Sequence, residues 1–167
     1  CYNVFHDPDG PGGQPAGSGV FHKYLVSQVD LVDNVAGSTT ETWTYTYPGS
    51  PGWAYQDNML YARGTGDQTW NQWRGYSAVT TQHGSGATTS TRYFRGMSGD
   101  HNADGSTKTV NLTDFRDQTW QDYPSLAGQV LSTRTYDTDG TELASTASQY
   151  WSNTTVDGPG FHNAVMV

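Results

Sequence analysis

The segment Thr42–Tyr47, TWTYTY, constrains the fold most, because threonine and aromatic residues alternate in it without a break. Successive side chains of a β-strand point to opposite faces, so the three rings would share one face and the three threonines the other. Both residue types favour strands over helices. The segment therefore predicts a strand, and the sequence PGSPG at residues 48–52 predicts its sharp end.

Other strand patterns recur at short intervals. Residues 21–32 have the pattern of one long strand. Residues 73–81 and 87–95 are predicted as a hairpin closed by QHGSG, and residues 107–113 as a further strand. Residues 129–136 and 141–150 are predicted as a second hairpin, because the Asp139-Gly140 pair between them is a strong turn signal. Only Asp122–Ala127 has the pattern of a helical turn.

The composition agrees with an all-β chain that forms its core from large rings. Hydrophobic residues make up 34% of the 167 residues and aromatic residues 13%, while Leu and Ile are scarce. We expect an antiparallel β-sandwich or a twisted sheet stack of hairpins. Residues 20–156 are predicted as a single domain, residues 1–19 as a Gly/Pro-rich linker or loop, and residues 157–167 as a C-terminal tail.

Charge and hydropathy exclude two classes of partner. The net charge is −8, and Lys23 and Lys108 are the only lysines. Nucleic acid binding needs clustered basic residues, so no nucleic acid partner is expected. No run of about 20 apolar residues is present, so no membrane span is expected.

The only cysteine is Cys1, so no intrachain disulfide can form. Its position allows three interpretations: an arbitrary boundary, the lipidated first residue of a bacterial lipoprotein, or the start of an intein. The intein interpretation is the weakest, because Ala164 follows Asn163 where a nucleophile should stand.

One segment has the spacing of a calcium loop. Asp100, Asn102 and Asp104, followed by Gly105, fit the first half of an EF-hand loop. The twelfth position is Asn111 rather than a bidentate glutamate, so we expect a calcium site between strands or, alternatively, a turn rich in Asp and Asn. Calcium is the only cofactor that the sequence suggests. The pairs Asp137/Asp139 and Asp7/Asp9 supply two of the three ligand positions.

Catalytic patterns are weak, and we expect no enzymatic activity. Glutamate occurs only at Glu41 and Glu142, and the five histidines are scattered without ligand spacing. The sequence contains none of the usual nucleophile, zinc or phosphate-binding motifs. A glycan-cleaving enzyme with paired carboxylates remains the third functional hypothesis.

Aromatic residues supply candidate ligand-binding positions. Trp53, Trp70, Trp73 and Tyr76 are candidates for stacking on sugar rings. The alternative is that the same rings form the core, which the low aliphatic content favours. The tetrapeptide DQTW occurs twice, at residues 67–70 and 117–120, and is either a structural repeat or a coincidence.

Residues 70–156 resemble part of the bacterial RHS/YD-repeat family, in its secreted actinobacterial form. The resemblance is carried by WRGY at 73–76, by YFRGM at 93–97 with Gly99-Asp100, and by GQVLSTRTYDTDGTELASTASQY at 128–150. It implies β-strands that spiral into a hollow shell, either enclosing a toxin domain or presenting modules at the cell surface.

The expected function is therefore a non-enzymatic β-structural module of a large secreted or cell-surface bacterial protein. Its expected partners are neighbouring repeats of the same chain, or other copies joined through strand edges. The alternative is a free-standing carbohydrate- or calcium-dependent binding module. A scaffold predicts buried tryptophans and unpaired edges, a binder predicts exposed and nearly coplanar rings, and an enzyme predicts a pocket containing a carboxyl of perturbed pKa.

Overall fold

The computed structural model describes residues 2–6, 17–35, 37, 39–55, 70–102, 104–153 and 163–166. This part of the chain is all-β, as predicted, and its one helical segment is the 3-10 helix η2 (Pro124–Leu126). No helix within it is long and apolar enough to cross a membrane. The strands are β1 (Tyr2–His6), β2 (Gly17–Phe21), β3 (Gln28–Leu31), β4 (Glu41–Thr46), β5 (Gly52–Ala54), β6 (Gln72–Gly75), β7 (Ala78–His83), β8 (Thr88–Tyr93), β9 (Asn111–Thr113), β10 (Thr119–Gln121), β11 (Val130–Tyr136), β12 (Glu142–Ala147), β13 (Tyr150–Asn153) and β14 (Asn163–Met166).

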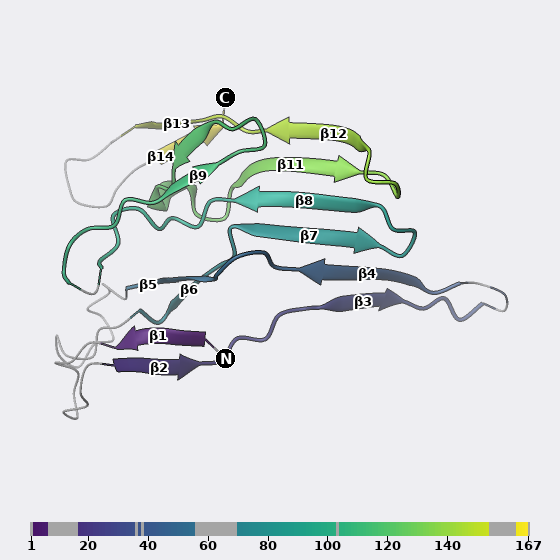
Figure 1. Cartoon of the computed structure of the whole chain (residues 1–167), viewed down its shortest axis with the longest axis horizontal. Helices are drawn as coiled ribbons and strands as arrows, with labels where there is room; N and C mark the ends of the chain where they lie inside the picture. The colour runs from purple at the N-terminus through teal and green to yellow at the C-terminus, as the bar shows by residue number, and fades with distance from the viewer. Residues whose placement is uncertain are drawn as a thin grey trace.

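The largest sheet has six strands in the order β12-β11-β8-β7-β4-β3. Every neighbouring pair is antiparallel. Because the spatial order follows the chain order, the sheet is a meander made of three hairpins, β3–β4, β7–β8 and β11–β12, which lie side by side (Figure 1).

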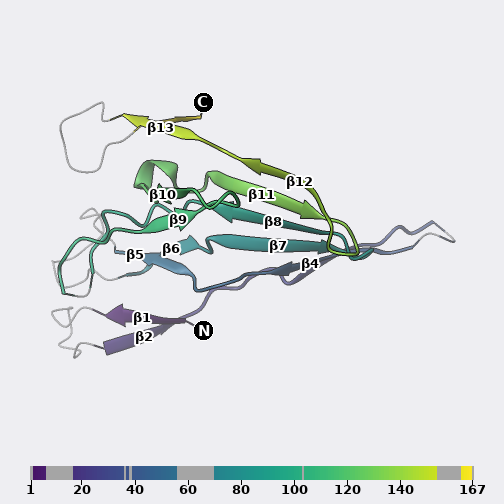
Figure 2. The same ribbon diagram turned by 45° about the horizontal axis from the view of Figure 1, so that its top comes forward.

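Four two-stranded ribbons alternate along the chain with these hairpins: β1–β2, β5–β6, β9–β10 and β13–β14. They gather at the end of the molecule opposite the turns of the three hairpins (Figures 1 and 2). The described strands thus form one large sheet and four small ones. The antiparallel all-β character is as predicted, with one six-stranded sheet built of three neighbouring hairpins in place of a sandwich of two large sheets.

Three predicted strands are wrong in extent. Of the predicted strand at residues 107–113, only Asn111–Thr113 form β9. Residues 21–32 do not form one strand, because Phe21 ends β2 and β3 begins only at Gln28. Residues 73–81 are divided between two sheets, β6 pairing with β5 and β7 with β4 and β8. Gly75 lies at the division with a φ of 75°, a left-handed conformation that redirects the chain and that suits glycine.

Three local predictions are confirmed. The alternating segment forms β4 and ends before Pro48. The predicted helical turn is η2. The segment Asp137–Gly140 is a hairpin turn, in which the Gly140 N–H donates to the Asp137 carbonyl at 3.0 Å and the Asp137 N–H to the Thr141 carbonyl at 2.8 Å.

Paired strands also lie near both ends of the chain. The strand β1 and the first residues of β2 fall within residues 1–19, predicted as linker or loop, and β14 falls within the predicted tail, residues 157–167. These strands were not predicted, because a Gly/Pro-rich sequence without alternation carries no local strand signal, although each strand pairs with its neighbour along the chain. Residues 7–16 and 154–162 lie outside the described residues.

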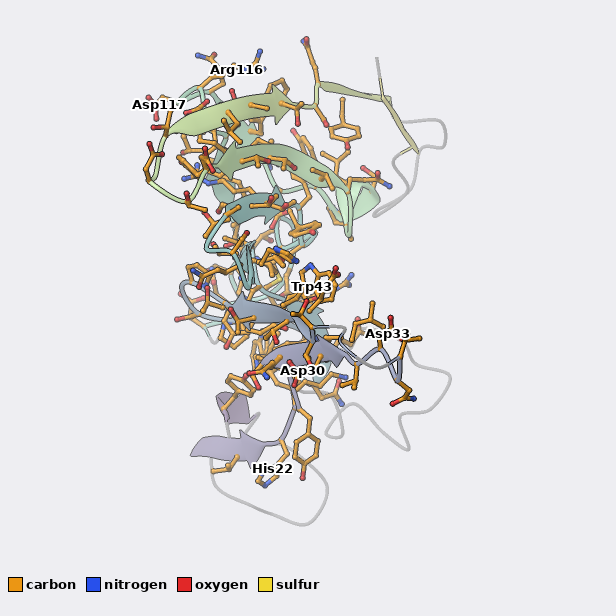
Figure 3. All side chains as sticks on the ribbon, turned by 90° about the vertical axis from the view of Figure 1, so that its right-hand side faces the viewer. His22, Asp30, Asp33, Trp43, Arg116 and Asp117 are labelled. Carbon is orange, nitrogen blue, oxygen red and sulfur yellow. The ribbon has the colours of Figure 1, made fainter. Side chains whose placement is uncertain are left out.

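The apolar core lies at the ribbon end of the molecule. Phe94, Leu126 and Leu131 form a buried cluster, and Leu112, Trp120, Tyr123 and Tyr150 pack against it. Phe94 meets the Tyr150 ring edge-on, with centroids 5.7 Å apart. The far half of the six-stranded sheet has no comparable cluster among the described residues, and its side chains cover both faces of the strands (Figure 3).

Candidate functional site

The predicted calcium loop is a tight hairpin. Gly99 donates its N–H to the Lys108 carbonyl, Lys108 donates to the Asp100 carbonyl, and Asn102 donates to the Ser106 carbonyl, at 2.7 to 2.9 Å. Gly105 adopts a φ of 80°, which permits the turn. The backbone of the segment is therefore held by its own hydrogen bonds.

The three predicted calcium ligands all have hydrogen-bond partners within the protein. Asp100 accepts the Tyr55 N–H at 2.9 Å and forms an ion pair of 2.7 Å with Lys108. Asp104 accepts the side-chain hydroxyl and backbone N–H of Ser106, and these two bonds lower its pKa. The Asn102 amide donates to the same hydroxyl at 2.9 Å. These contacts are those of a turn rich in Asp and Asn.

No group of three or more His, Cys, Asp or Glu that could hold a metal is found in the described ranges. Calcium binding at Asp100, Asn102 and Asp104 stays a prediction. Asp137 and Asp139 accept N–H groups of their own turn, from Thr138 at 2.7 Å and Thr141 at 2.8 Å. Asp7 and Asp9 lie outside the described residues.

Three of the four predicted sugar-stacking residues meet in one aromatic cluster, which consists of Tyr2, Tyr47, Trp53, Trp73 and Tyr76. The rings of Trp53 and Trp73 lie 5.0 Å apart at 71°, and Tyr76 lies 6.0 Å from Trp73 at 70°. Tyr2 contacts both tryptophans, and the Tyr76 hydroxyl donates to the Tyr2 hydroxyl at 3.2 Å. This hydrogen bond and burial raise the pKa of Tyr76 to about 12.

Trp70 lies in a different place from the aromatic cluster. It is 8% exposed, its indole N–H donates to the His101 carbonyl at 2.9 Å, and its ring meets Tyr55 edge-on at 4.9 Å. Its ring contacts both Tyr55, which follows β5, and the hairpin between Gly99 and Lys108. The other DQTW copy ends at Trp120, which packs on the core, but residues 67–69 lie outside the described residues, so the predicted repeat stays untested.

The geometry of the rings differs from a flat sugar platform. In the described part of the chain, the aromatic pairs make interplanar angles between 44° and 88°. A sugar-binding platform of two nearly coplanar rings is not among these pairs. Edge-to-face contacts of this kind are typical of packed aromatic cores.

Two buried carboxylates have structural roles that sequence reasoning missed. Asp114 is fully buried and accepts the N–H groups of Arg116 at 2.7 Å and Gln118 at 3.0 Å, closing the turn between β9 and β10. Burial raises its pKa, but these amides, the Trp120 indole and the Arg116 charge together lower it below the usual value. Asp122 is equally buried and accepts the N–H groups of Arg95 and Gly96. An aspartate at the first position of a turn, whose carboxylate can accept the N–H two residues further on, was the available signal for Asp114.

Two arginines of the large sheet hold the same turn against the sheet. The guanidinium groups of Arg92 and Arg134 lie 4.3 and 4.7 Å from the centre of the Phe115 ring. Arg92 donates to the Thr113 and Asp114 carbonyls, and Arg134 to the Phe115 carbonyl. Each guanidinium thus combines a cation–π contact with a hydrogen bond, so the contact fixes the ribbon on the sheet.

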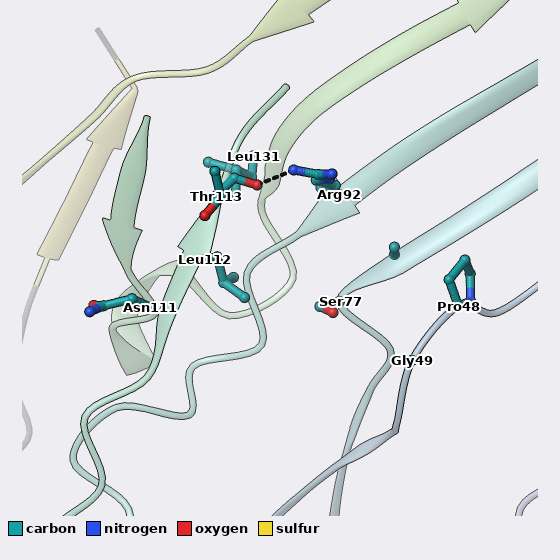
Figure 4. A pocket seen from close by; sticks show the side chains of 9 residues that line it. Pro48, Gly49, Ser77, Arg92, Asn111, Leu112, Thr113 and Leu131 are labelled. Carbon is teal, nitrogen blue, oxygen red and sulfur yellow. Dashed lines mark hydrogen bonds between the residues drawn. The ribbon is translucent and has the colours of Figure 1, made fainter. Parts of the chain in front are cut away.

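A cavity of 340 Å³ lies between β9 and the large sheet (Figure 4). Its lining consists of Pro48, Gly49, Ser77, Ala78, Arg92, Asn111, Leu112, Thr113 and Leu131. This lining contains no carboxylate, histidine or cysteine, and the three aspartates whose pKa is lowered, Asp104, Asp114 and Asp139, do not border it. Two further hollows near the β3–β4 connection do include acidic side chains, one of 390 Å³ lined in part by Asp33 and Glu41 and one of 510 Å³ lined in part by Glu41 and His83. A glycan-cleaving activity stays an untested hypothesis.

Comparisons with known proteins gave no match to a family model, a curated protein or a solved structure.

Proposed function

We propose that the chain is a non-enzymatic β-structural module of a large secreted bacterial protein of the RHS/YD-repeat type, acting in toxin delivery or at the cell surface. The observation that carries the proposal is the chain-ordered meander, whose edge strands β3 and β12 have no outer partner among the described strands. Such a sheet extends by adding one hairpin after another, as in repeat proteins in which each unit contacts its neighbours.

The hairpins recur at a regular spacing. The second strands of the three hairpins, β4, β8 and β12, begin at residues 41, 88 and 142, so the interval is about 50 residues, near the upper end for repeat architectures. A two-stranded ribbon precedes each hairpin along the chain. A regular alternation of this kind supports a structural repeat.

The aromatic residues support a structural role over a binding role. Trp70 is buried, and the rings of the aromatic cluster contact one another edge-on or at a tilt rather than presenting parallel faces. The contacts join β5 and β6 to Tyr2 of β1 and to Tyr47 and Tyr76, next to the large sheet. In this position the rings hold the ribbons against the sheet.

A glycan panel, run with calcium and with EDTA, tests the proposal against the binding alternative. The wild-type chain is compared with Trp53→Ala and Trp73→Ala in the same panel and in thermal unfolding. We expect no glycan binding or cleavage, and a lower melting temperature in both variants, because each loses edge-to-face contacts.

A different result would contradict the proposal. Calcium-dependent binding of a defined sugar, abolished by Trp73→Ala while the melting temperature stays the same, would establish the carbohydrate-binding alternative. Cleavage of any glycan in the panel would establish the enzymatic one. Asp104→Asn is the matched control for the calcium arm, because it removes the charge at the predicted calcium ligand.

A further inference from the structure

We propose that copies of this chain stack head to tail, with β3 of one copy pairing antiparallel with β12 of the next. This inference rests on the proposed function, because it treats the two unpaired edges as the joining surfaces of a scaffold. It goes further in naming the partner as a second copy and in fixing the register.

Among the described residues, the outer side of each edge has no strand partner, and both edges expose apolar side chains. Within the described residues, β3 pairs only with β4, and β12 only with β11. All four residues of β3 are exposed, and the stretch around it exposes large apolar side chains from Val20 to Val35. On β12, Leu143 is 62% exposed. Neither strand contains a lysine or a proline, which commonly protect sheet edges.

The outward-facing backbone groups of the two edges can be assigned from two hydrogen bonds. Tyr45 donates its N–H to the Ser27 carbonyl at 2.9 Å. Because hydrogen-bonded and non-bonded pairs alternate in an antiparallel ladder, Val29 and Leu31 also direct their backbone groups to β4. Gln28 and Asp30 therefore direct theirs outward.

The same reasoning applies to β12. Ser148 donates its N–H to the Leu131 carbonyl at 2.9 Å, so Thr146 and Ala144 face β11 in the continuing ladder. Ser145 and Ala147 therefore direct their backbone groups outward. Residues 142–143 contain a bulge, which leaves residues 144–147 as the regular part of this edge.

One register meets three conditions. It places outward-facing backbone groups opposite each other, keeps every side chain on its own face of the sheet, and uses only residues 144–147 of β12. It pairs Gln28 with Ala147, Val29 with Thr146, Asp30 with Ser145 and Leu31 with Ala144 of the next copy. The known registers place Val29 and Thr146 on one face of the large sheet and Asp30 and Ser145 on the other, so no side chain changes face.

The direction of the strands and the position of the turns agree with this register. In Figure 1 the arrows of β3 and β12 point in opposite directions at the two margins of the sheet. A translated copy would therefore continue the antiparallel alternation. The register also brings the β3–β4 connection and the β11–β12 turn to the same end of the stack.

The side chains of the paired positions are compatible. Val29 would meet the Thr146 methyl group and Leu31 would meet Ala144. The Asp30 carboxylate accepts hydrogen bonds of 2.8 Å from Gln28 and Thr42 of its own copy, and it would face the Ser145 hydroxyl rather than another charge. Because the two edges differ, the contact is heterologous, and it builds an open stack rather than a closed dimer.

Disulfide trapping tests the register. In a Cys1→Ser background, a chain with Val29→Cys is mixed under mild oxidation with a chain with Thr146→Cys that differs in mass. These positions form a non-hydrogen-bonded pair, whose Cα separation of about 4.5 Å lies within the range for a disulfide. We expect the mixed dimer as the main product. Gln28→Cys mixed with Thr146→Cys is the matched control and should not cross-link, because these side chains lie on opposite faces.

The outcomes separate this inference from its alternatives. Homodimers of the Val29→Cys chain in place of the mixed dimer would overturn the stack in favour of a two-fold β3–β3 contact. Cross-linking no higher than in the Gln28→Cys control would overturn the stack altogether. Both results leave the glycan panel unaffected, so a failed register and a failed scaffold assignment are distinguishable.

A proline variant provides the second measurement. Asp30→Pro removes an outward-facing N–H of β3 while the bonds of Val29 and Leu31 to β4 remain. We expect loss of the mixed dimer when this change is added to the Val29→Cys chain, and light scattering at the monomer mass of 18.2 kDa. The melting temperature should match that of an Asp30→Ala control, which loses the same side-chain hydrogen bonds from Gln28 and Thr42 but keeps the N–H. A proline chain that keeps its melting temperature and still forms the dimer would contradict the proposed pairing.

Discussion

The two ends of the six-stranded sheet are built from the same strands but differ in what stabilises them. At the ribbon end, the buried cluster of Phe94, Leu126 and Leu131 and the aromatic cluster provide apolar contacts. At the turn end, the central strands β7 and β8 are half-buried and the edge strands β3 and β12 are exposed. The difference shows that strand pairing and a few cross-strand side-chain contacts, such as the Trp43 and His83 rings 5.2 Å apart, stabilise the turn end, whereas a buried apolar cluster stabilises the ribbon end.

Hydroxyl contacts take the place of a core at the turn end. The Thr80 hydroxyl donates to Ser90 on the neighbouring strand at 3.3 Å, and Thr89 and Thr135 lie 3.4 Å apart. Cross-strand pairs of this kind contribute a few tenths of a kcal/mol to about 1 kcal/mol each. We therefore expect local opening to begin at the turn end and global unfolding to require loss of the ribbon-end core.

The largest expected difference in unfolding free energy between the two ends comes from replacing a leucine with alanine at each end. Leu131→Ala removes a fully buried side chain of the ribbon-end cluster and should lower the free energy of unfolding by about 2–5 kcal/mol. Leu143→Ala removes a side chain that is 62% exposed and should change it by less than about 0.5 kcal/mol. Urea unfolding measures both, and equal losses would mean that the two ends are not distinct.

Replacing a glycine with alanine at each end should give a smaller difference in unfolding free energy than the leucine pair. Gly96 and Gly140 have φ values of 71° and 85°, so alanine at either position should cost about 1–2 kcal/mol for the left-handed backbone. At Gly96 a Cβ would also lie 2.9 Å from the Ala127 side chain and 3.0 Å from the Pro124 backbone, whereas Gly140 has open space. We expect Gly96→Ala to cost roughly 1–3 kcal/mol more than Gly140→Ala in urea unfolding. Equal costs would argue against close packing at η2.

The smallest expected difference between the two ends is in how the unfolding free energy depends on pH. The pKa of Asp114 and of Asp139 is lowered in the folded state, for Asp114 by amides, an indole and Arg116 despite burial, and for Asp139 by two bonds from Thr141. A lowered folded pKa means that the unfolded chain binds more protons. The stabilisation is therefore complete above the unfolded pKa of about 4 and is lost as the pH falls through the folded pKa.

Asp114→Asn should lower the free energy of unfolding at neutral pH by about 1–3 kcal/mol and should reduce its decline below about pH 4. Asp139→Asn, at the exposed turn, should change the same curve less, since water screens its hydrogen bonds. Unfolding free energies measured from pH 7 down to about pH 2 check both variants. A larger pH effect at Asp139 than at Asp114 would reverse the comparison between the two ends.

Much of the local structure was predictable from the sequence. The alternation in β4, the Asp-Gly turn, the 3-10 helix after Asp122 and the hairpin between β7 and β8 are all encoded within a few neighbouring residues. In each case the signal is side-chain period or turn chemistry, which acts before any distant segment is placed. Three of the four candidate aromatic residues meet in the folded chain and Trp70 lies apart from them, while sugar binding by these residues stays a prediction.

Tertiary structure decided what each segment pairs with and which polar groups are buried. The strand β6 leaves the predicted hairpin for β5, strands form near both chain ends, and Trp70 separates from Trp53 and Trp73. Nothing in the sequence marks Asp114 and Asp122 as buried, yet both carboxylates are fully buried and accept backbone N–H groups. Strand pairing and burial depend on contacts between residues far apart in the chain, so local periodicity fixes where a strand can form and only the folded whole fixes its partner.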